Sequence, residues 1–315
     1  MLRKDFLLHY GRQFGTFFGL IILSFILWIL TPYFFTVSNL LNIAQQTSIN
    51  AIIAVGMTFV IITAGIDLSV GSILAFSGVV LASTLNVGVP VPLAILVGLG
   101  VGFICGIVNG LLITRGKLPP FISTLGMMSV ARGAALLYSH GRPISGFSKT
   151  FRILATGEIF HIPSPVIIML IVYIIAHFVL TKTKLGRYTY AIGGNEEAAL
   201  LSGVNVKFYK AMVYGISGML SGLAAVILTA RLNSAQPIAG IMYELDAIAA
   251  TVIGGTSLMG GEGTIVGTLI GALIMGVLRN GLNLLGVSSF IQQIVIGSVI
   301  IIAVLVDMAL KKRRN

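Results

Sequence analysis

Apolar runs of about 20 residues recur from one end of this 315-residue chain to the other. Each run is long enough to cross a hydrocarbon core of about 30 Å as a helix. Charged residues make up only 9% of the chain, against about 25% in a soluble domain, so they cannot cover a water-facing surface. The runs also lack the polar alternation of a transmembrane barrel. The sequence therefore predicts an all-α polytopic membrane protein.

We expect about ten transmembrane helices, with a range of eight to ten because the third and the eighth are short. The first apolar run is too long for a signal peptide and lacks a cleavage site, which favours a retained span. No linker is visible, so residues 1–315 are predicted to form a single transmembrane domain. The expected spans are 14–35, 42–64, 70–85, 91–113, 119–138, 163–181, 210–230, 245–259, 264–285 and 290–310.

The net charge of +11 is spread over the tails and the loops between spans. With the N-terminus inside, the positive-inside rule is satisfied, and both termini and the segment 182–209 are cytoplasmic. The charge therefore sets the topology and gives no reason to expect a nucleic-acid partner. Basic residues on the cytoplasmic side are then Arg3, Lys4, Arg12, Arg115, Lys117, Lys182, Lys184, Arg187, Lys207, Lys210 and Lys311 to Arg314, and those outside are Arg142, Lys149, Arg152 and Arg231.

Two runs of glycines spaced four residues apart predict tight helix packing. On a helix this spacing makes a flat face of small residues, which another backbone can approach closely. A second interpretation, that these faces slide to open a path, stays open. The runs are Gly98, Gly102, Gly106 and Gly110, and Gly263, Gly267 and Gly271.

No segment carries a catalytic or metal-binding constellation. The phosphate-binding pattern GxxxxGK[ST] is absent, so the chain does not hydrolyse ATP by itself. The histidines and the single cysteine lack metal-ligand spacing, and we expect no metal or cofactor. Acids and histidines are rare inside the spans, whereas ion-coupled transporters usually need them. An external energy source is therefore favoured over a secondary transporter or channel working alone, and over an intramembrane enzyme.

Four amides at the start of the second span suggest a path for a polar solute. Asn42, Gln46 and Asn50 are spaced by four residues and share one helix face, with Gln45 beside them. Amides both donate and accept hydrogen bonds, which suits a neutral polyhydroxylated solute. The alternative is hydrogen bonding between helices, worth under about 1–2 kcal/mol for each bond.

Charged residues at the ends of spans have two interpretations each. Asp67 is either part of a gate or the stabiliser of the next helix start, where the helix dipole favours a carboxylate. Glu244 and Asp246 open the eighth span, and we expect the same dipole effect there. Arg132 and Arg279 lie toward the outer ends of their spans, where snorkelling to the membrane surface would explain them.

The segment YTYAIGGNEEAALLSGVNVKFYK, residues 188–210, has the composition of a short helix between turns. Such a helix in the longest inner loop adds nothing to a membrane span. It suits docking by a soluble cytoplasmic partner.

Four blocks of sequence resemble one family. Residues 56–72 (GMTFVIITAGIDLSVGS), 186–206, 231–274 and 280–290 (NGLNLLGVSSF) resemble the permease subunit of bacterial ribose ATP-binding-cassette importers. The match extends from about residue 30 to the last span. Permeases for xylose, galactose and autoinducer-2 belong to the same wider family, so the identity of the sugar stays open.

The resemblance implies a multi-pass protein of the bacterial inner membrane that works with several partners. These are a second permease subunit in a homodimer, a cytoplasmic ATP-binding subunit, an extracytoplasmic sugar-binding protein and a monosaccharide substrate. The sugar-binding protein is expected to dock on the outer loop 231–243, through Asn233 and Gln236, with Asp67 as a gate.

The resemblance also implies a coupling helix, with the pattern Glu-Ala-Ala, three residues, Gly. The companion proline of that pattern is absent, which leaves the individual contacts with the ATP-binding subunit open. The expected ATPase-coupling residues are Gly194, Asn195, Glu196, Glu197, Ala198, Ala199 and Gly203.

Overall fold

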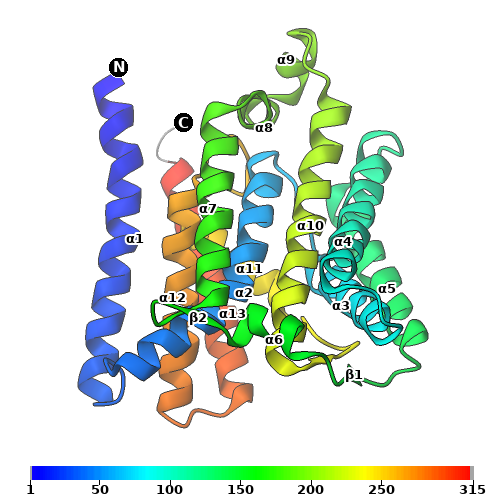
Figure 1. The fold of residues 1–315 in the computed structure, drawn as a ribbon. Coiled ribbons are helices and arrows are strands. Elements are labelled where there is room, and N and C mark those ends of the chain that lie inside the picture. The colour runs from blue at the N-terminus through cyan, green and yellow to red at the C-terminus, as the bar shows by residue number, and fades with distance from the viewer. Residues whose placement is uncertain (1, 313–315) are drawn as a thin grey trace.

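The computed structural model describes the backbone of residues 2–312 and the side chains of residues 14–305 and 308. Within that range the chain forms a bundle of helices with two short strand pairs (Figure 1). The basic residues of the first twelve positions and of the C-terminal tail therefore lie outside the described side chains. The helices are α1 (Leu2–Leu30), α2 (Val37–Ile62), α3 (Val70–Asn86), α4 (Val91–Thr114), α5 (Pro120–Tyr138), α6 (Lys149–Thr156), α7 (Ser164–Lys182), α8 (Lys184–Gly194), α9 (Glu196–Leu201), α10 (Val206–Leu232), α11 (Tyr243–Ile253), α12 (Ile265–Leu284) and α13 (Ser289–Lys312).

The ten expected spans all contain a helix. By length and composition, α2, α4, α5, α7, α10 and α12 can each cross a membrane, and shorter apolar helices occupy Phe14–Leu30, Val70–Asn86 and Ser289–Leu305. The all-α polytopic membrane fold is therefore confirmed. The described helices that were not expected as spans are α6, α8 and α9.

The eighth predicted span, 245–259, is wrong as a complete crossing. The corresponding α11 has only 11 residues, which gives a length of about 16 Å at 1.5 Å per residue. It ends because Gly254 is its C-cap and Gly255 has a left-handed φ of +91°. A glycine adopts that conformation without a steric penalty and so stops the helix.

The bundle has two distinct ends (Figure 1). Helix α1 begins at the end that carries α8 and α9, which we call the α9 end, and α13 runs toward it. The opposite end, the α6 end, carries α6 and the strands. Strand β1 (Ile144–Ser145) pairs antiparallel with β4 (Ser234–Ala235), and β2 (Glu158–Ile159) pairs antiparallel with β3 (Ile162–Pro163). The segments 139–162 and 182–209 thus lie at opposite ends, as the expected topology requires.

Helix α4 packs closely against α10 through backbone contacts. A Cβ on Gly102 would overlap the carbonyl of Gly218, and a Cβ on Gly106 would overlap the carbonyl of Tyr214. Helix α12 packs on α11 in the same way, with Gly271 against the carbonyl of Ala250. The prediction of tight packing is therefore confirmed for the α4 run and for Gly267 and Gly271. Gly263 instead lies in the loop before α12.

Candidate functional site

Helix α9 is a short helix whose two ends are fixed by local sequence. Asn195 is its N-cap, and the side-chain oxygen accepts a hydrogen bond from the Ala198 nitrogen at 2.9 Å. Glu196 and Glu197 occupy the first turn, where the helix dipole favours negative charge. Gly203 follows with a φ of +83°, a conformation that glycine adopts readily. The residues expected for coupling therefore form one structural unit.

Helix α9 is anchored on one face and open on the others. Ala199 is buried in a small apolar cluster with Ile192 and Val206. By contrast, Leu200 and Leu201 are 61% and 83% exposed. Exposed leucines at the tip of a helix in an otherwise polar turn mark a surface suited to a protein partner.

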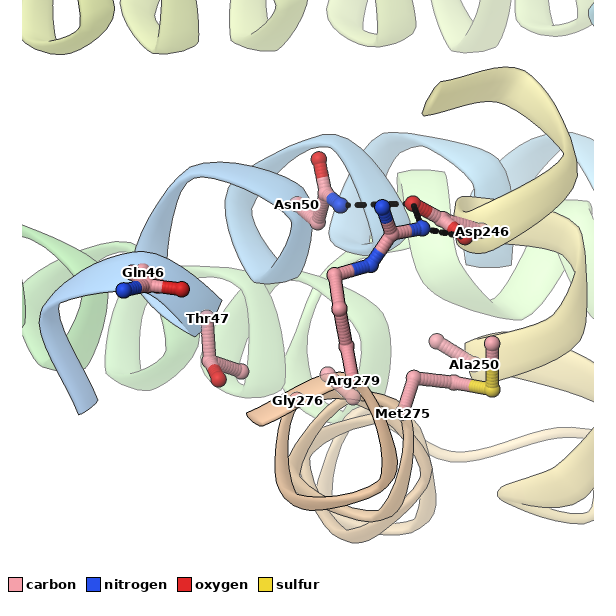
Figure 2. Close-up of a pocket in the computed structure, with 9 residues that line it drawn as sticks. Gln46, Thr47, Asn50, Asp246, Ala250, Met275, Gly276 and Arg279 are labelled. Carbon is pink, nitrogen blue, oxygen red and sulfur yellow. Dashed lines mark hydrogen bonds and ion pairs between the residues drawn. The ribbon is translucent and has the colours of Figure 1, made fainter. Parts of the chain in front are cut away.

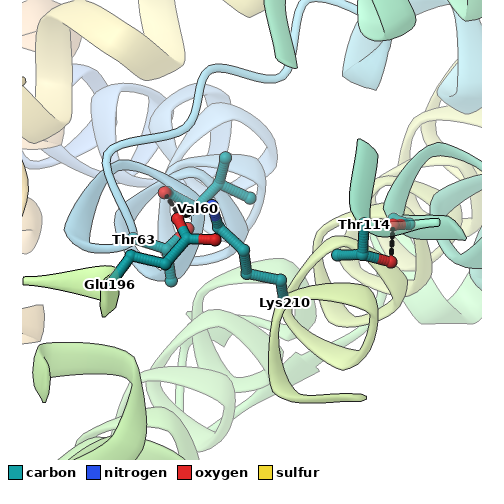
Figure 3. A network of polar contacts seen from close by, with 6 residues as sticks. Val60, Thr63, Thr114, Glu196 and Lys210 are labelled. Carbon is teal, nitrogen blue, oxygen red and sulfur yellow. Dashed lines mark hydrogen bonds and ion pairs between the residues drawn. The ribbon is translucent and has the colours of Figure 1, made fainter. Parts of the chain in front are cut away.

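An ion pair joins α9 to the start of α10 (Figure 3). Lys210 Nζ lies 2.6 Å from Glu196 Oε2. Of the two glutamates, Glu196 is thus already paired, while Glu197 is exposed and has no ion-pair partner in the described part of the chain. This difference leaves Glu197 available for an external contact.

Helix α8 connects α9 to the interior of the bundle. The Tyr190 hydroxyl donates a 2.6 Å hydrogen bond to the Gly263 carbonyl, in the loop between α11 and α12. The Gly261 nitrogen of that loop donates to the Ile62 carbonyl, the last residue of α2, at 2.9 Å. A Cβ on Gly193 of α8 would overlap the same Ile62 oxygen. Helix α8 therefore contacts the 254–264 loop through the Tyr190 side chain and the end of α2 through the backbone at Gly193.

The amides of α2 separate into two environments. Gln46 Nε2 donates to Asn42 Oδ1 at 2.8 Å, and Asn50 Nδ2 donates to Asp246 Oδ2 at 3.0 Å. Gln45 instead faces α6, where it donates to the Ala155 carbonyl at 3.0 Å. The expected shared face therefore holds for Asn42, Gln46 and Asn50, while Gln45 takes part in helix packing.

A polar cavity lies between α2, α11 and α12 (Figure 2). Its volume is about 40 Å³, and Gln46, Thr47, Asn50, Asp246 and Arg279 contribute its polar lining. In the described part of the chain, Thr47 Oγ1 and Asn50 Oδ1 are buried without a hydrogen-bond partner. A cavity needs about 10–15 Å³ of such volume to hold one water molecule, so this one has room for a few waters.

An ion pair closes one side of this cavity. Arg279 Nη2 lies 2.8 Å from Asp246 Oδ1 and 2.7 Å from Asp246 Oδ2. Snorkelling is therefore the wrong explanation for Arg279. Asp246 lies in the first turn of α11, as expected, but its carboxylate also bonds across to α12 and α2. The sequence alone does not reveal this pair, because its members are 33 residues apart. The available signal is an arginine within a span that has no oppositely charged neighbour nearby in the sequence.

Asp67 lies in the interior of the bundle, in the turn between α2 and α3. Its Oδ1 accepts from the nitrogen and the hydroxyl of Ser69, and its Oδ2 accepts from Ser217 of α10 at 2.9 Å. Ser69, rather than Asp67, is the N-cap of α3. With a side chain 0% exposed, Asp67 is unavailable for docking by another protein and instead ties the α2–α3 turn to α10.

The loop after α10 is held in place by two side chains. Asn233 Oδ1 accepts from the Phe147 nitrogen at 3.0 Å, so this side chain joins the loop to the segment before α6. Arg132 Nη1 donates to the carbonyls of Pro237 and Ala239 at 2.7 Å each, so the arginine is tied to this loop. Of the two residues expected for docking, Gln236 is exposed and Asn233 is partly buried.

These features describe a polytopic membrane protein with a polar cavity inside the bundle and an exposed helix at one end. Residues 39–304 match the family described as the permease component of the branched-chain amino acid transport system, and the chain belongs to that family. It is a multi-pass bacterial inner-membrane protein and a non-enzymatic transport subunit.

Named relatives cover nearly the whole chain. It is 53% identical to the ribose import permease of Haemophilus influenzae, over 93% of this chain and 92% of the relative. It is 55% identical to the ribose import permease of Bacillus subtilis, over 94% of this chain and 92% of the relative. It is 45% identical to the D-allose transport system permease of Escherichia coli, over 95% of this chain and 93% of the relative. No solved structure matches the chain at a significant level.

Proposed function

We propose that the chain is the permease subunit of an ATP-driven importer for ribose or a related monosaccharide. The observation that carries this proposal is the 53–55% identity to two ribose import permeases over more than nine-tenths of the chain. At 45% identity the D-allose permease is a more distant relative, which favours ribose over that sugar. Another monosaccharide and autoinducer-2 remain the alternatives within the class.

The α9 end faces the cytoplasm in this proposal, and α9 docks on an ATP-binding subunit. The exposed Leu200, Leu201 and Glu197 support this assignment, because they offer an apolar and acidic surface at the tip of a rigidly capped helix. Glu196 has a different role, since Lys210 already neutralises it. Closure of the ATP-binding subunits then moves α8 and α9 together, and segment 182–209 acts as the coupling loop.

The moving elements are α2, α11 and α12. Tyr190 and Gly193 of α8 contact the 254–264 loop and the end of α2, so motion of α8 is passed on to the helices that line the cavity. The present cavity of about 40 Å³ is closed to a sugar. A shift between two packings of these helices would open it, in the manner of a shear transition.

Sugar hydroxyls are the solute groups that this lining suits. The free Thr47 hydroxyl and Asn50 carbonyl oxygen, together with the Gln46 amide, supply neutral donors and acceptors. A second copy of the chain completes the path, and a sugar-binding protein docks at the α6 end, where Gln236 is exposed. Affinity resides mainly in that protein, because tight binding inside the path would retain the sugar.

A complementation experiment tests the proposal. The chain is expressed in a Bacillus subtilis strain that lacks its own ribose import permease, and uptake of radiolabelled ribose is measured with unlabelled allose, fructose or galactose as competitors. We expect ATP-dependent ribose uptake to be restored. Uptake of a different sugar alone would redirect the substrate while leaving the importer class intact.

A stand-alone secondary transporter is the alternative from another class. The purified chain is placed in liposomes without any partner, and solute uptake is driven by a proton or sodium gradient. We expect no uptake. Gradient-driven sugar accumulation under these conditions would overturn the proposal.

A further inference from the structure

A second, larger cavity lies at the α9 end, between the end of α4 and the start of α10. Its volume is about 510 Å³. Arg115 follows the last residue of α4, and Lys207 lies in the first turn of α10, so the two cations come from different helices and meet at one cavity. None of the side-chain contacts proposed for transport involves a residue that lines this cavity.

The two cations of this cavity lack a counter-charge. Both Arg115 and Lys207 are exposed, and neither has an ion-pair partner in the described part of the chain. Lys207 also opposes the dipole of α10, because a helix N-terminus favours anions and disfavours cations. The cavity therefore presents a local excess of positive charge that a bound anion would neutralise.

Apart from Asn205, the remaining wall of the cavity is apolar. Leu111 and Phe208 are 37% and 52% exposed, and Met212 continues this wall along α10 toward the middle of the bundle. A ligand that matches the whole cavity therefore has an anionic group at the end of the bundle and a hydrocarbon portion alongside the helices. Basic pockets between transmembrane helices on the cytoplasmic side commonly hold lipid headgroups.

We propose that this cavity binds an acidic phospholipid, with its phosphate between Arg115 and Lys207 and an acyl chain against Leu111, Phe208 and Met212. Bound there, the lipid bridges α4 and α10, two helices that already pack closely through Gly102 and Gly106. The lipid thereby stabilises the junction between the bundle and segment 182–209.

Native mass spectrometry of the purified, delipidated full chain tests the proposal. Phosphatidylglycerol, phosphatidylcholine with the same acyl chains, and inorganic phosphate are added in separate arms. We expect one phosphatidylglycerol to bind about tenfold more tightly than phosphatidylcholine, because only the former leaves its phosphate charge unbalanced for the two cations. Equal binding of the two lipids would overturn the proposal.

Charge variants identify the site. The double variant Arg115→Gln/Lys207→Gln should lower phosphatidylglycerol binding to the phosphatidylcholine level. The matched double variant Lys182→Gln/Arg187→Gln removes the same two charge types from exposed positions at the same end and should bind as the wild type does. If both double variants lose phosphatidylglycerol binding equally, the lipid is attracted by the overall positive charge of this end of the bundle. That result would contradict a specific site at Arg115 and Lys207.

A third variant separates a lipid from a free anion. Met212→Trp fills the apolar part of the cavity and leaves both cations in place. We expect it to weaken phosphatidylglycerol binding, and we expect millimolar inorganic phosphate not to displace the lipid from the wild type. Displacement by phosphate, or unchanged lipid binding in Met212→Trp, would mean that the site recognises the anion alone.

Discussion

Arg279 and Asp246 join α12 to α11, with Arg279 Nη2 2.7 Å from Asp246 Oδ2. Asn50 of α2 donates to the same oxygen at 3.0 Å, so one carboxylate connects the three helices that border the polar cavity. The Asp246 side chain is only 4% exposed. A carboxylate so far from water depends on its partners, and losing one partner is more harmful than replacing both.

Arg279→Leu should destabilise the chain by about 1–3 kcal/mol, because it leaves a buried carboxylate without its cation. The double variant Asp246→Asn/Arg279→Leu should recover much of that loss, since an amide carries no charge to neutralise. Thermal unfolding in detergent measures both. Equal unfolding temperatures for the single and the double variant would contradict the interpretation of the pair.

Asn50→Leu should reduce sugar uptake more than it reduces assembly. It removes the hydrogen bond to the Asp246 carboxylate, worth about 1.5–3 kcal/mol. It also removes the carbonyl oxygen that faces the cavity without a partner. Gln45→Leu is the matched comparison on the same helix, and it loses only a bond to the Ala155 carbonyl. We measure uptake per permease in membranes. If both variants transport equally well, the amides serve packing alone.

The predictions from sequence succeeded where the determining physics is local. Span positions follow from hydropathy, and α9 follows from the capping amide of Asn195 and the glycine at Gly203. The end of α11 was missed because an apolar run continues past Ile253, while Gly255 in a left-handed conformation stops the helix. The apolar run alone does not show where a helix inside a membrane bundle ends.

Contacts between distant segments could not be read from the sequence. The pairing of Asp246 with Arg279 and the bond from Tyr190 to Gly263 depend on how the helices pack. The position of Gln45 in the sequence likewise does not show whether its amide faces α6 or the cavity. The structure places it against α6. The sequence identifies amides that could line the cavity, and the packing of the helices determines that Gln46 and Asn50 do so while Gln45 does not.

Glu197→Lys should abolish association with the ATP-binding subunit while leaving the fold intact. The exposed carboxylate has no internal ion-pair partner among the described residues. Reversal of its charge therefore costs the fold only its interaction with the α9 dipole, about 0.3–1 kcal/mol. Glu158→Lys, an equally exposed change at the α6 end, is the control. Co-purification with the ATP-binding subunit is measured, and normal recovery with Glu197→Lys would contradict docking at α9.

Tyr190 should make stability depend on pH only under alkaline conditions. Burial raises the pKa of Tyr190 to about 12, against about 10 in the unfolded chain. Between these values the unfolded chain loses the proton first, so the free energy of unfolding falls by about 2–3 kcal/mol as pH rises. Below pH 10 the hydroxyl stays protonated and continues to donate to Gly263. The difference in unfolding temperature between wild type and Tyr190→Phe, followed from pH 7 upward, should therefore stay constant and then shrink.

Gly193→Ala should separate ATP hydrolysis from sugar uptake. The added methyl group would overlap the Ile62 carbonyl, a backbone atom that no side-chain rotation can move, so α8 must shift away from the end of α2. We expect a cost of about 1–3 kcal/mol and a fall in uptake of about tenfold, because motion of α8 no longer reaches the cavity helices. ATPase activity of the assembled complex should persist, since α9 is unchanged.

Gly126→Ala is the control for this experiment. Gly126 is also helical, in α5, and nothing lies within 4 Å of an added Cβ. Uptake and ATPase activity are measured in the same proteoliposomes. If uptake and hydrolysis fall in proportion in Gly193→Ala, the contact serves assembly; if neither falls, α8 transmits motion by another route. A loss of uptake with ATPase activity retained is the result that the Gly193–Ile62 contact predicts. In that case ATP is still hydrolysed, but the transmembrane helices no longer change conformation in response.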